Sequence, residues 1–296
     1  MTLLVAPEVR EALSGACPRP VVALETSIVA QGLPRPHNLR AALGCEEAIR
    51  AAGAVPATIA VLDGAVRVGL TRAEIEALAA ADDAAKVSAK DLGWAIAKRR
   101  AGATTVAATA RAAALAGVRF MATGGIGGVH RGHPEDVSAD LDELARSPVA
   151  VFCAGAKMIL DLAQTLERLE TLGVPVLGYG CDELPGFYLR RTGLPVDARI
   201  DGPREAAAVL RASWATGTRG VVVAVPPPGD LPGAAEAVEQ AIARQGSVAG
   251  KEVTPFLLAL VAELSGGRSL DFNVDLVVNN ARAAAETSVE YAAFGP

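Results

Sequence analysis

The sequence predicts an α/β fold, a three-layer α/β/α arrangement in which a largely parallel sheet carries helices on both faces. Short apolar runs alternate with longer alanine-rich helical patterns through most of the 296 residues. This alternation is typical of strands joined by crossover helices. Because buried parallel strands read as continuous apolar runs, we predict strands at residues 21–24, 58–62, 118–122, 149–152, 174–177 and 220–225.

The helical patterns lie between these runs and continue after the last of them. Alanine and leucine recur in them at the spacing of one helical face. They predict helices at 38–52, 72–81, 105–116, 140–146, 157–172, 203–215 and 234–245, and two consecutive helices at 254–265 and 273–293 that could cover a sheet edge or the active site. We find no linker composition and no internal repeat, so we expect one domain over residues 1–296.

Composition excludes several classes of protein. Hydrophobic residues make up 51% and charged residues 21% of the chain, which is ample for a sizeable core. The net charge is −5 and no basic run exceeds 98–100, so we expect no nucleic-acid partner. No apolar stretch reaches the ~18 residues of a membrane span. The four cysteines form no Cys-x-x-Cys pair, which indicates reduced thiols in a cytoplasmic protein.

Lys157 is the residue that packing explains least. It ends the apolar run 147–157 and precedes a predicted helix, so it should lie at a strand-to-helix turn. Burial there would favour the neutral amine, which is a nucleophile. The chain has 28 basic residues, of which only five are lysine (Lys86, Lys90, Lys98, Lys157, Lys251), so a retained lysine suggests amine chemistry. The alternative is a side chain that extends from a buried backbone to solvent.

A glycine-rich segment, 123–132, directly follows a predicted strand. Glycines let backbone N–H groups approach an anion, and His130 with Arg131 adds donors and charge. A dinucleotide-binding loop would open a long helix, whereas the acidic stretch 134–143 follows here. We therefore expect a phosphate-binding or substrate-binding loop rather than an NAD site. The alternative is a glycine-rich turn without a ligand.

Several polar residues follow this loop or end other strands. Asp136 and Asp140, with Ser138 between them, would share one helical face and suit Mg²⁺ or Mn²⁺, although Asp136 or Ser138 could simply cap a helix. Glu25 directly follows the first predicted strand, where a partly buried carboxyl can act as a general acid; the alternative is a helix cap or a surface acid. Lys86 could hold a phosphate.

Ten segments of this chain, in order from about residue 20 to about residue 290, together resemble the pseudouridine-5′-phosphate glycosidase family, also called the indigoidine synthase A-like family. They include Ala23-Leu-Glu-Thr-Ser27 and Val151-Phe-Cys-Ala-Gly-Ala-Lys157. The full set is 23–27, 55–64, 86–92, 102–106, 122–132, 136–141, 151–157, 177–179, 250–256 and 273–281.

The resemblance implies reversible cleavage of the C–C glycosidic bond of pseudouridine 5′-phosphate, which gives uracil and ribose 5-phosphate. It makes Lys157 the amine nucleophile, which forms an imine, and Glu25 the proton donor. It makes Asp136 the ligand of Mn²⁺, with other divalent cations possible, and it implies a cytoplasmic homotrimer with an α/β/α core. The substrate contacts that it implies are Lys86, Val106, His130, Ser138, Ala139, Asp140 and Asn280.

The segment Val225-Pro226-Pro227-Pro228 departs from the family pattern, because it lacks the asparagine of the usual Asn-Pro-Ile-Pro. This puts one possible substrate contact in doubt. Two other functions remain open from the residues alone. One is a class I aldolase-like lyase, which also forms a lysine imine, and the other is a non-catalytic sugar-phosphate-binding protein.

Overall fold

The computed structural model describes residues 2–14, 19–244, 248 and 253–295. Cys17, Lys251 and the start of the segment 250–256 that resembles the family, residues 250–252, lie outside the described residues.

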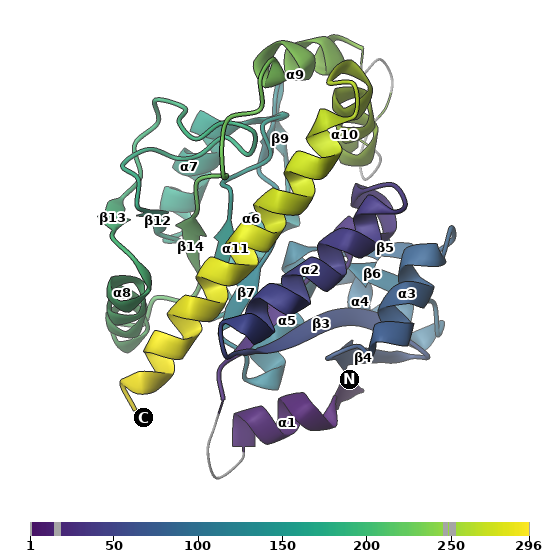
Figure 1. Ribbon diagram of the computed structural model, residues 1–296, viewed down its shortest axis with the longest axis vertical. Helices are drawn as coiled ribbons and strands as arrows, with labels where there is room; N and C mark the ends of the chain where they lie inside the picture. The colour runs from purple at the N-terminus through teal and green to yellow at the C-terminus, as the bar shows by residue number, and fades with distance from the viewer. Residues whose placement is uncertain (1, 15–18, 245–247, 249–252, 296) are drawn as a thin grey trace.

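Helices cover both faces of one large mixed sheet (Figure 1). Within the described residues the sheet has eleven strands, and most neighbouring pairs are parallel. The strands in spatial order are β1 (Leu3–Val5), β4 (Ala65–Val68), β3 (Val55–Leu62), β2 (Val21–Leu24), β7 (Phe120–Ala122), β10 (Ala150–Cys153), β14 (Val221–Ala224), β12 (Val176–Tyr179) and β13 (Ala198–Ile200), with β5 (Ala85–Val87) and β6 (Gly102–Thr104) paired to each other and β6 also to β3. The predicted fold class is confirmed.

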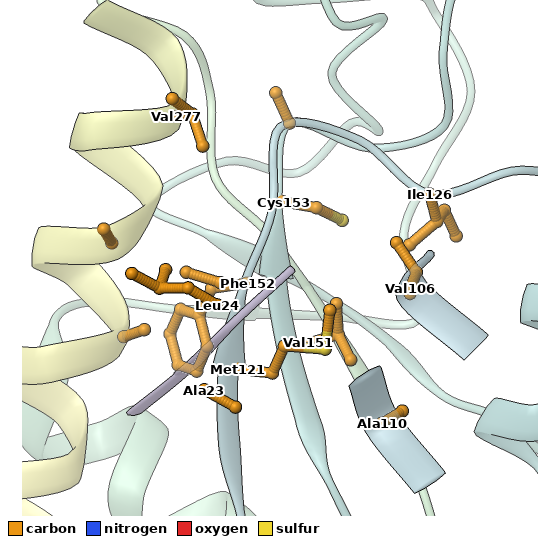
Figure 2. Close-up of a cluster of buried hydrophobic side chains, with 14 of the residues drawn as sticks. Ala23, Leu24, Val106, Ala110, Met121, Ile126, Val151, Phe152, Cys153 and Val277 are labelled. Carbon is orange, nitrogen blue, oxygen red and sulfur yellow. The ribbon is translucent and has the colours of Figure 1, made fainter. Parts of the chain in front are cut away.

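Two long helices, α2 and α11, run side by side across one face of the sheet, and α5 packs on the other (Figures 1 and 2). The α-helices are α1 (Pro7–Ser14), α2 (His37–Ala51), α3 (Arg72–Ala80), α4 (Leu92–Ala97), α5 (Val106–Ala116), α6 (Ala139–Leu144), α7 (Leu162–Thr171), α8 (Pro203–Ala215), α9 (Ala234–Ala243), α10 (Val253–Leu264) and α11 (Arg268–Ala293). A short π-helix, η1 (Ile28–Gly32), follows β2, and a 3₁₀ turn, η2 (Ala89–Asp91), follows β5.

The core lies on both sides of the central strands β2, β7 and β10, whose residues are all buried. Successive side chains point to opposite faces of a strand. Phe152 therefore faces α11, where Val277 lies, whereas Val151 faces α5, where Ala110 lies (Figure 2). Burial on both faces explains why these strands are continuous apolar runs in the sequence.

The helix predicted at 157–172 begins five residues later than expected, so this part of the prediction is wrong. Asp161 is the N-cap of α7, and its Oδ1 accepts a hydrogen bond from the backbone N–H of Gln164 at 3.0 Å. The residues before it form β11 (Leu160–Asp161), which joins β8 (Val129–His130) and β9 (His133–Val137) in a small antiparallel sheet. These pairings occupy the backbone groups that an earlier helix would need.

Two expectations from composition can be compared with the structure. Among the described residues, no helix is both long enough and apolar enough to cross a membrane. The three described cysteines, Cys45, Cys153 and Cys181, are free. Burial raises the pKa of the Cys153 thiol to about 12, so this thiol behaves as a core side chain rather than a nucleophile.

Candidate active site

A cavity of about 350 Å³ lies at the carboxyl ends of the central strands. Glu25 follows β2, Thr123 follows β7 and Lys157 follows β10 after a short turn, and all three line the cavity. Because β7 pairs with both β2 and β10, the sheet itself brings these side chains together. Ligands in open α/β sheets bind at this edge.

Glu25 is almost completely buried, with 8% of its surface exposed. Oε1 accepts a hydrogen bond from the hydroxyl of Thr123, and Oε2 accepts one from the hydroxyl of Ser27. The carboxyl is thus held by two hydroxyl groups in the cavity wall. The alternative that Glu25 is a surface acid is wrong.

Lys157 lies in the turn between β10 and β11, and its amine points to the glycine-rich segment. Nζ donates a hydrogen bond to the backbone oxygen of Gly125 at 2.7 Å. The backbone N–H of Lys157 donates to the oxygen of Ile126 at 3.1 Å. The turn depends on Gly155, which has φ +77° and whose Cβ, if present, would clash with the backbone oxygen of Pro185. Lys157 is therefore held at the cavity wall by its surroundings.

The glycine-rich segment itself supports the Lys157 turn. Ala154 donates its backbone N–H to the oxygen of Gly124 at 2.8 Å, and Ile126 donates to the oxygen of Gly155 at 3.1 Å. The backbone N–H of Gly127 donates to Oδ2 of Asp140 at 2.9 Å. The segment lines the cavity, as expected of a substrate loop, but these N–H groups bind protein acceptors rather than point to an anion.

Arg131 also differs from its expected role as an anion ligand. Its guanidinium donates hydrogen bonds to the backbone oxygens of Met158 at 2.8 Å and Leu160 at 3.0 Å. A third nitrogen forms an ion pair with Glu239 on α9 at 2.5 Å. Arg131 therefore fastens the segment after Lys157 and does not line the cavity.

Asp136 and Asp140 do not share a helical face, so that prediction is wrong. Asp136 lies on β9, exposed at the cavity, whereas Asp140 lies in the first turn of α6 and is buried. Oδ1 of Asp140 accepts a hydrogen bond from the backbone N–H of Ala107 at 2.9 Å and Oδ2 accepts from Gly127. Ser138 is the N-cap of α6, which was one of the two alternatives for it. Asp140 thus ties α5, α6 and the glycine-rich segment together.

Lys86 on β5 and the N-terminus of α5 contribute another part of the cavity wall. Thr105 is the N-cap of α5, and its hydroxyl oxygen is buried without a hydrogen-bond partner among the described residues. Val106 is the first residue of this helix and also lines the cavity. A helix N-terminus and a nearby ammonium group both favour an anion.

His130 on β8 lines the cavity near the charged groups. Burial lowers the pKa of its imidazole; the carboxylate of Asp136 opposes this change, and the cationic groups of Lys86 and Lys157 add to it. The imidazole is therefore mainly neutral at neutral pH, in a form that can both donate and accept a hydrogen bond.

Asn280 lies behind the cavity wall rather than on it. It is fully buried on α11, and Nδ2 donates hydrogen bonds to the backbone oxygens of Thr123 at 2.8 Å and Gly124 at 3.3 Å. Its predicted contact with substrate stays a prediction. Two other predicted substrate contacts, Ser138 and Ala139, do line the cavity.

The proline segment Val225–Pro228, which departs from the family pattern, lies outside the described cavity wall. The backbone oxygen of Pro226 accepts a hydrogen bond from Asn279 at 3.3 Å, and those of Pro227 and Pro228 accept from Arg190 at 3.4 Å. Its carbonyl groups therefore bind neighbouring protein segments.

Several residues that line the cavity have no individual role among the predictions from sequence, although Thr123 belongs to the predicted glycine-rich loop. Thr123 and Thr105 each follow a strand, which is a local signal that could have identified them. Phe187 and Asn273 come from a loop and from α11, far away in the chain, and carry no such signal. Gln31, in η1, also lines the cavity.

The residues present are compatible with a divalent cation held mainly by water and substrate. No group of three or more potential metal-ligating side chains occurs in the described part of the chain. Among the described residues that line the cavity, Asp136 alone has an exposed carboxylate. Mg²⁺ prefers oxygen ligands, as the predicted Mn²⁺ does, and is commonly held by one or two carboxylates together with substrate phosphate and water.

A family model and several relatives match nearly the whole chain. The model of the family described as indigoidine synthase A like protein matches residues 8–290. A pseudouridine-5′-phosphate glycosidase of Solibacter usitatus is 52% identical over 97% of this chain and 98% of its own length. One from Myxococcus xanthus is 50% identical over 99% of both chains.

Two solved structures share the fold. The prealnumycin C-glycosynthase AlnA, in complex with ribulose 5-phosphate, has a TM-score of 0.89 and 37% identity over 99% of this chain and 98% of its own. An indigoidine synthase A-like protein of Thermotoga maritima has a TM-score of 0.88 and 32% identity over 97% and 96% of the two chains. With the sequence match, these likenesses establish that the chain belongs to the indigoidine synthase A-like family.

Proposed function

We propose that this protein is an enzyme that reversibly cleaves the C–C glycosidic bond of pseudouridine 5′-phosphate, giving uracil and ribose 5-phosphate. The observation that carries the proposal is the placement of Lys157 and Glu25 on one cavity at the ends of neighbouring strands. The likeness to proteins named pseudouridine-5′-phosphate glycosidase supports it. So does the likeness to a C-glycosynthase in complex with a pentose phosphate.

The reaction begins with opening of the ribose ring. Uracil bound through carbon is a poor leaving group, so protonation of a base nitrogen is not sufficient to break the bond. Glu25 donates a proton to the ring oxygen, and the bond between this oxygen and the anomeric carbon breaks. Its position between two hydroxyl donors fixes the carboxyl for this transfer.

Lys157 then adds to the exposed anomeric carbon, which is conjugated with the uracil ring. A proton is delivered to the uracil carbon, the C–C bond breaks, and uracil leaves. The sugar stays attached to Nζ as an imine, and water hydrolyses this imine to ribose 5-phosphate and the free amine. An arginine could not replace the lysine, because its guanidinium stays protonated and forms no imine.

The phosphate group of the substrate binds near Lys86 and the N-terminus of α5. Val106 provides the helix N-terminus, and Ser138 with Ala139 provides the start of α6 on the same cavity. The unpartnered hydroxyl of Thr105 supplies a further hydrogen-bond donor. His130 contributes a neutral imidazole to the polar wall.

Asp136 holds a divalent cation, for which we propose Mn²⁺. Such an ion would supply positive charge next to the substrate phosphate. We also propose a homotrimer in the cytoplasm, on the basis of the family resemblance.

The test is direct. Purified protein is incubated with uracil, ribose 5-phosphate and Mn²⁺, and chromatography is used to detect pseudouridine 5′-phosphate. Borohydride reduction during turnover, followed by peptide mass spectrometry, should locate a sugar phosphate on Lys157. Replacing uracil and ribose 5-phosphate by a pair of aldol substrates tests the aldolase-like alternative. Sugar-phosphate binding without product or trapped adduct would instead identify the non-catalytic binding protein.

A further inference from the structure

Phe187 has an unusual backbone that places its ring in the cavity wall. Its φ is +65°, in the left-handed region that a bulky side chain rarely adopts. Backbone strain of this kind persists only where surrounding contacts hold it, and it often occurs at functional sites. Here the backbone N–H of Phe187 donates to the oxygen of Ala154 at 2.9 Å, three residues before Lys157.

The ring of Phe187 lies directly against the glycine-rich segment. A Cβ atom added at Gly125 would lie 2.6 Å from Cδ2 of Phe187 and 2.9 Å from Cε2, so only glycine fits beneath the ring. The backbone oxygen of the same Gly125 accepts the hydrogen bond from Nζ of Lys157. An aromatic surface thus borders the position of the proposed nucleophile.

Asn273 on α11 adds a polar group to this part of the wall. It is 6% exposed, and its Oδ1 is buried without a hydrogen-bond partner among the described residues. Nδ2 lies 3.5 Å from the hydroxyl oxygen of Tyr188, whose ring packs edge-on to Phe187 with centroids 4.9 Å apart. A buried carbonyl oxygen without a donor is costly, and a ligand N–H would remove that cost.

Phe187 and the proposed phosphate-binding residues approach the cavity from opposite sides of the reacting centre. Lys86 lies on β5, which is connected through β6 to β3, whereas Phe187 lies in the loop after β12, beyond β10 and β14. Glu25 and Lys157, at the ends of β2 and β10, lie between them in the strand order. A substrate with phosphate at Lys86 and its anomeric carbon at Lys157 would direct its base toward Phe187.

We propose that Phe187 and Asn273 form the nucleobase-binding end of the cavity and determine which heterocycle the enzyme accepts. The ring of Phe187 packs against the flat face of the base, since aromatic side chains bind bases through their faces. The amide of Asn273 accepts a hydrogen bond from a ring N–H of uracil. A site that hydrogen-bonds an N–H discriminates strongly against analogues that lack it. This inference rests on the proposed function, whose substrate it makes more specific.

The test compares two Michaelis constants in the synthetic direction. For Phe187→Leu and Asn273→Ala, we expect the KM for uracil to rise at least about 10-fold, the scale of one lost stacking or hydrogen-bonding contact. The KM for ribose 5-phosphate should stay within about twofold. A residue that only supports the fold would not affect one substrate selectively.

Phe272→Leu and Asn279→Ala are matched controls. Phe272 precedes Asn273 and packs near Tyr188, with ring centroids 5.9 Å apart, and Asn279 binds the backbone of Pro226; neither lines the cavity. Both controls should keep the wild-type KM for uracil. Circular dichroism checks folding. If Phe187→Leu is unfolded, the KM values of Asn273→Ala decide whether the base-binding assignment holds.

Two negative outcomes are distinguishable. If wild-type protein makes no pseudouridine 5′-phosphate, the proposed function fails and this inference fails with it. If wild-type protein is active but folded Asn273→Ala changes the two KM values equally, or changes only that for ribose 5-phosphate, the base-binding assignment alone is overturned.

Discussion

The hydroxyl of Thr123 at the end of β7 donates a hydrogen bond to Oε1 of Glu25 at the end of β2, so two paired strands together fix the proposed proton donor. Both residues line the cavity. The backbone oxygen of Thr123 is in turn held by Asn280 on α11 at 2.8 Å. Replacing the Thr123 side chain should therefore alter the setting of Glu25 while this backbone contact remains.

Thr123→Val removes the hydroxyl and keeps the shape of the side chain. Hydrogen bonds to charged groups contribute about 1.5–3 kcal/mol, so we expect kcat to fall about 10- to 100-fold. Thr123→Ser keeps the hydroxyl and should stay close to wild type. Steady-state turnover of pseudouridine 5′-phosphate measures both variants. Activity of Thr123→Val within twofold of wild type would show that this hydrogen bond does not matter for catalysis.

Asp140→Asn should destabilise the protein as well as inactivate it. Both carboxylate oxygens of Asp140 accept backbone N–H groups, from Ala107 and Gly127. An asparagine presents an NH₂ group to one of these donors, and an unsatisfied buried group costs about 1–3 kcal/mol. We expect the midpoint of urea unfolding to shift down accordingly. An unchanged midpoint would mean that Asp140 does not tie these segments together.

The central part of the fold could be predicted because its signals are local. Strands β2, β7 and β10 are buried on both faces, so their residues are continuously apolar. In contrast, β9 is mostly exposed and polar, and β11 has two residues. Such strands form because they pair with β8, and no periodicity in the sequence predicts that pairing. For this reason two predictions were wrong: the helix that begins at Lys157, and the helical face shared by Asp136 and Asp140.

The site divides in the same way. Glu25 and Lys157 follow apolar runs, so their place at the carboxyl edge of the sheet could be inferred from neighbouring residues. Phe187 and Asn273 reach the cavity only because the loop after β12 and the long helix α11 pack against it, and tertiary contacts of that kind leave no local pattern. The sequence also could not predict that Arg131 binds backbone oxygens after Lys157, because a guanidinium binds carbonyl groups and anions alike.

Removal of divalent cations should lower activity, with Asp136 responsible for the effect. Exhaustive chelation with EDTA should abolish most turnover, and added Mn²⁺ should restore it. Asp136→Asn should be poorly active at all Mn²⁺ concentrations but should unfold at the wild-type urea concentration, because Asp136 is exposed. Undiminished turnover after chelation would contradict the proposed cation. If Asp136→Asn lost as much stability as Asp140→Asn, Asp136 would have a structural role like that of Asp140 rather than a role in cation binding.

Glu46 on α2 should make stability depend on pH. Burial raises the pKa of its carboxyl, although Thr58 donates a hydrogen bond to Oε1 at 2.6 Å. The folded-state pKa lies above the unfolded value of about 4.3. The contribution of Glu46 to the free energy of unfolding is therefore fully present below that value. It is lost as pH rises through the folded-state pKa. Glu46→Gln should therefore gain stability relative to wild type as pH increases.

Urea unfolding from pH 4 to pH 8 measures this difference. Glu47→Gln, at the exposed neighbouring position on α2, is the matched control and should follow the wild-type curve. Parallel curves for Glu46→Gln and wild type would show that Glu46 has no such effect.

Lys157→Arg should be folded and nearly inactive. Arginine keeps the positive charge and can still donate to the oxygen of Gly125, the contact that Nζ makes now at 2.7 Å. A lysine with only a structural or phosphate-binding role would tolerate this change at least in part. A nucleophile would not, because the guanidinium forms no imine. Removal of a catalytic nucleophile can cost on the order of 10⁶-fold in turnover.

Turnover of pseudouridine 5′-phosphate and borohydride trapping are measured together, with circular dichroism to monitor folding. Lys98→Arg is the matched control, because Lys98 is exposed at the end of α4 and does not line the cavity; it should match wild type in both assays. If folded Lys157→Arg retained more than about a tenth of wild-type turnover, the increase in the barrier would be under ~1.4 kcal/mol. That is too small for the loss of covalent catalysis, and the imine mechanism would be wrong for this protein.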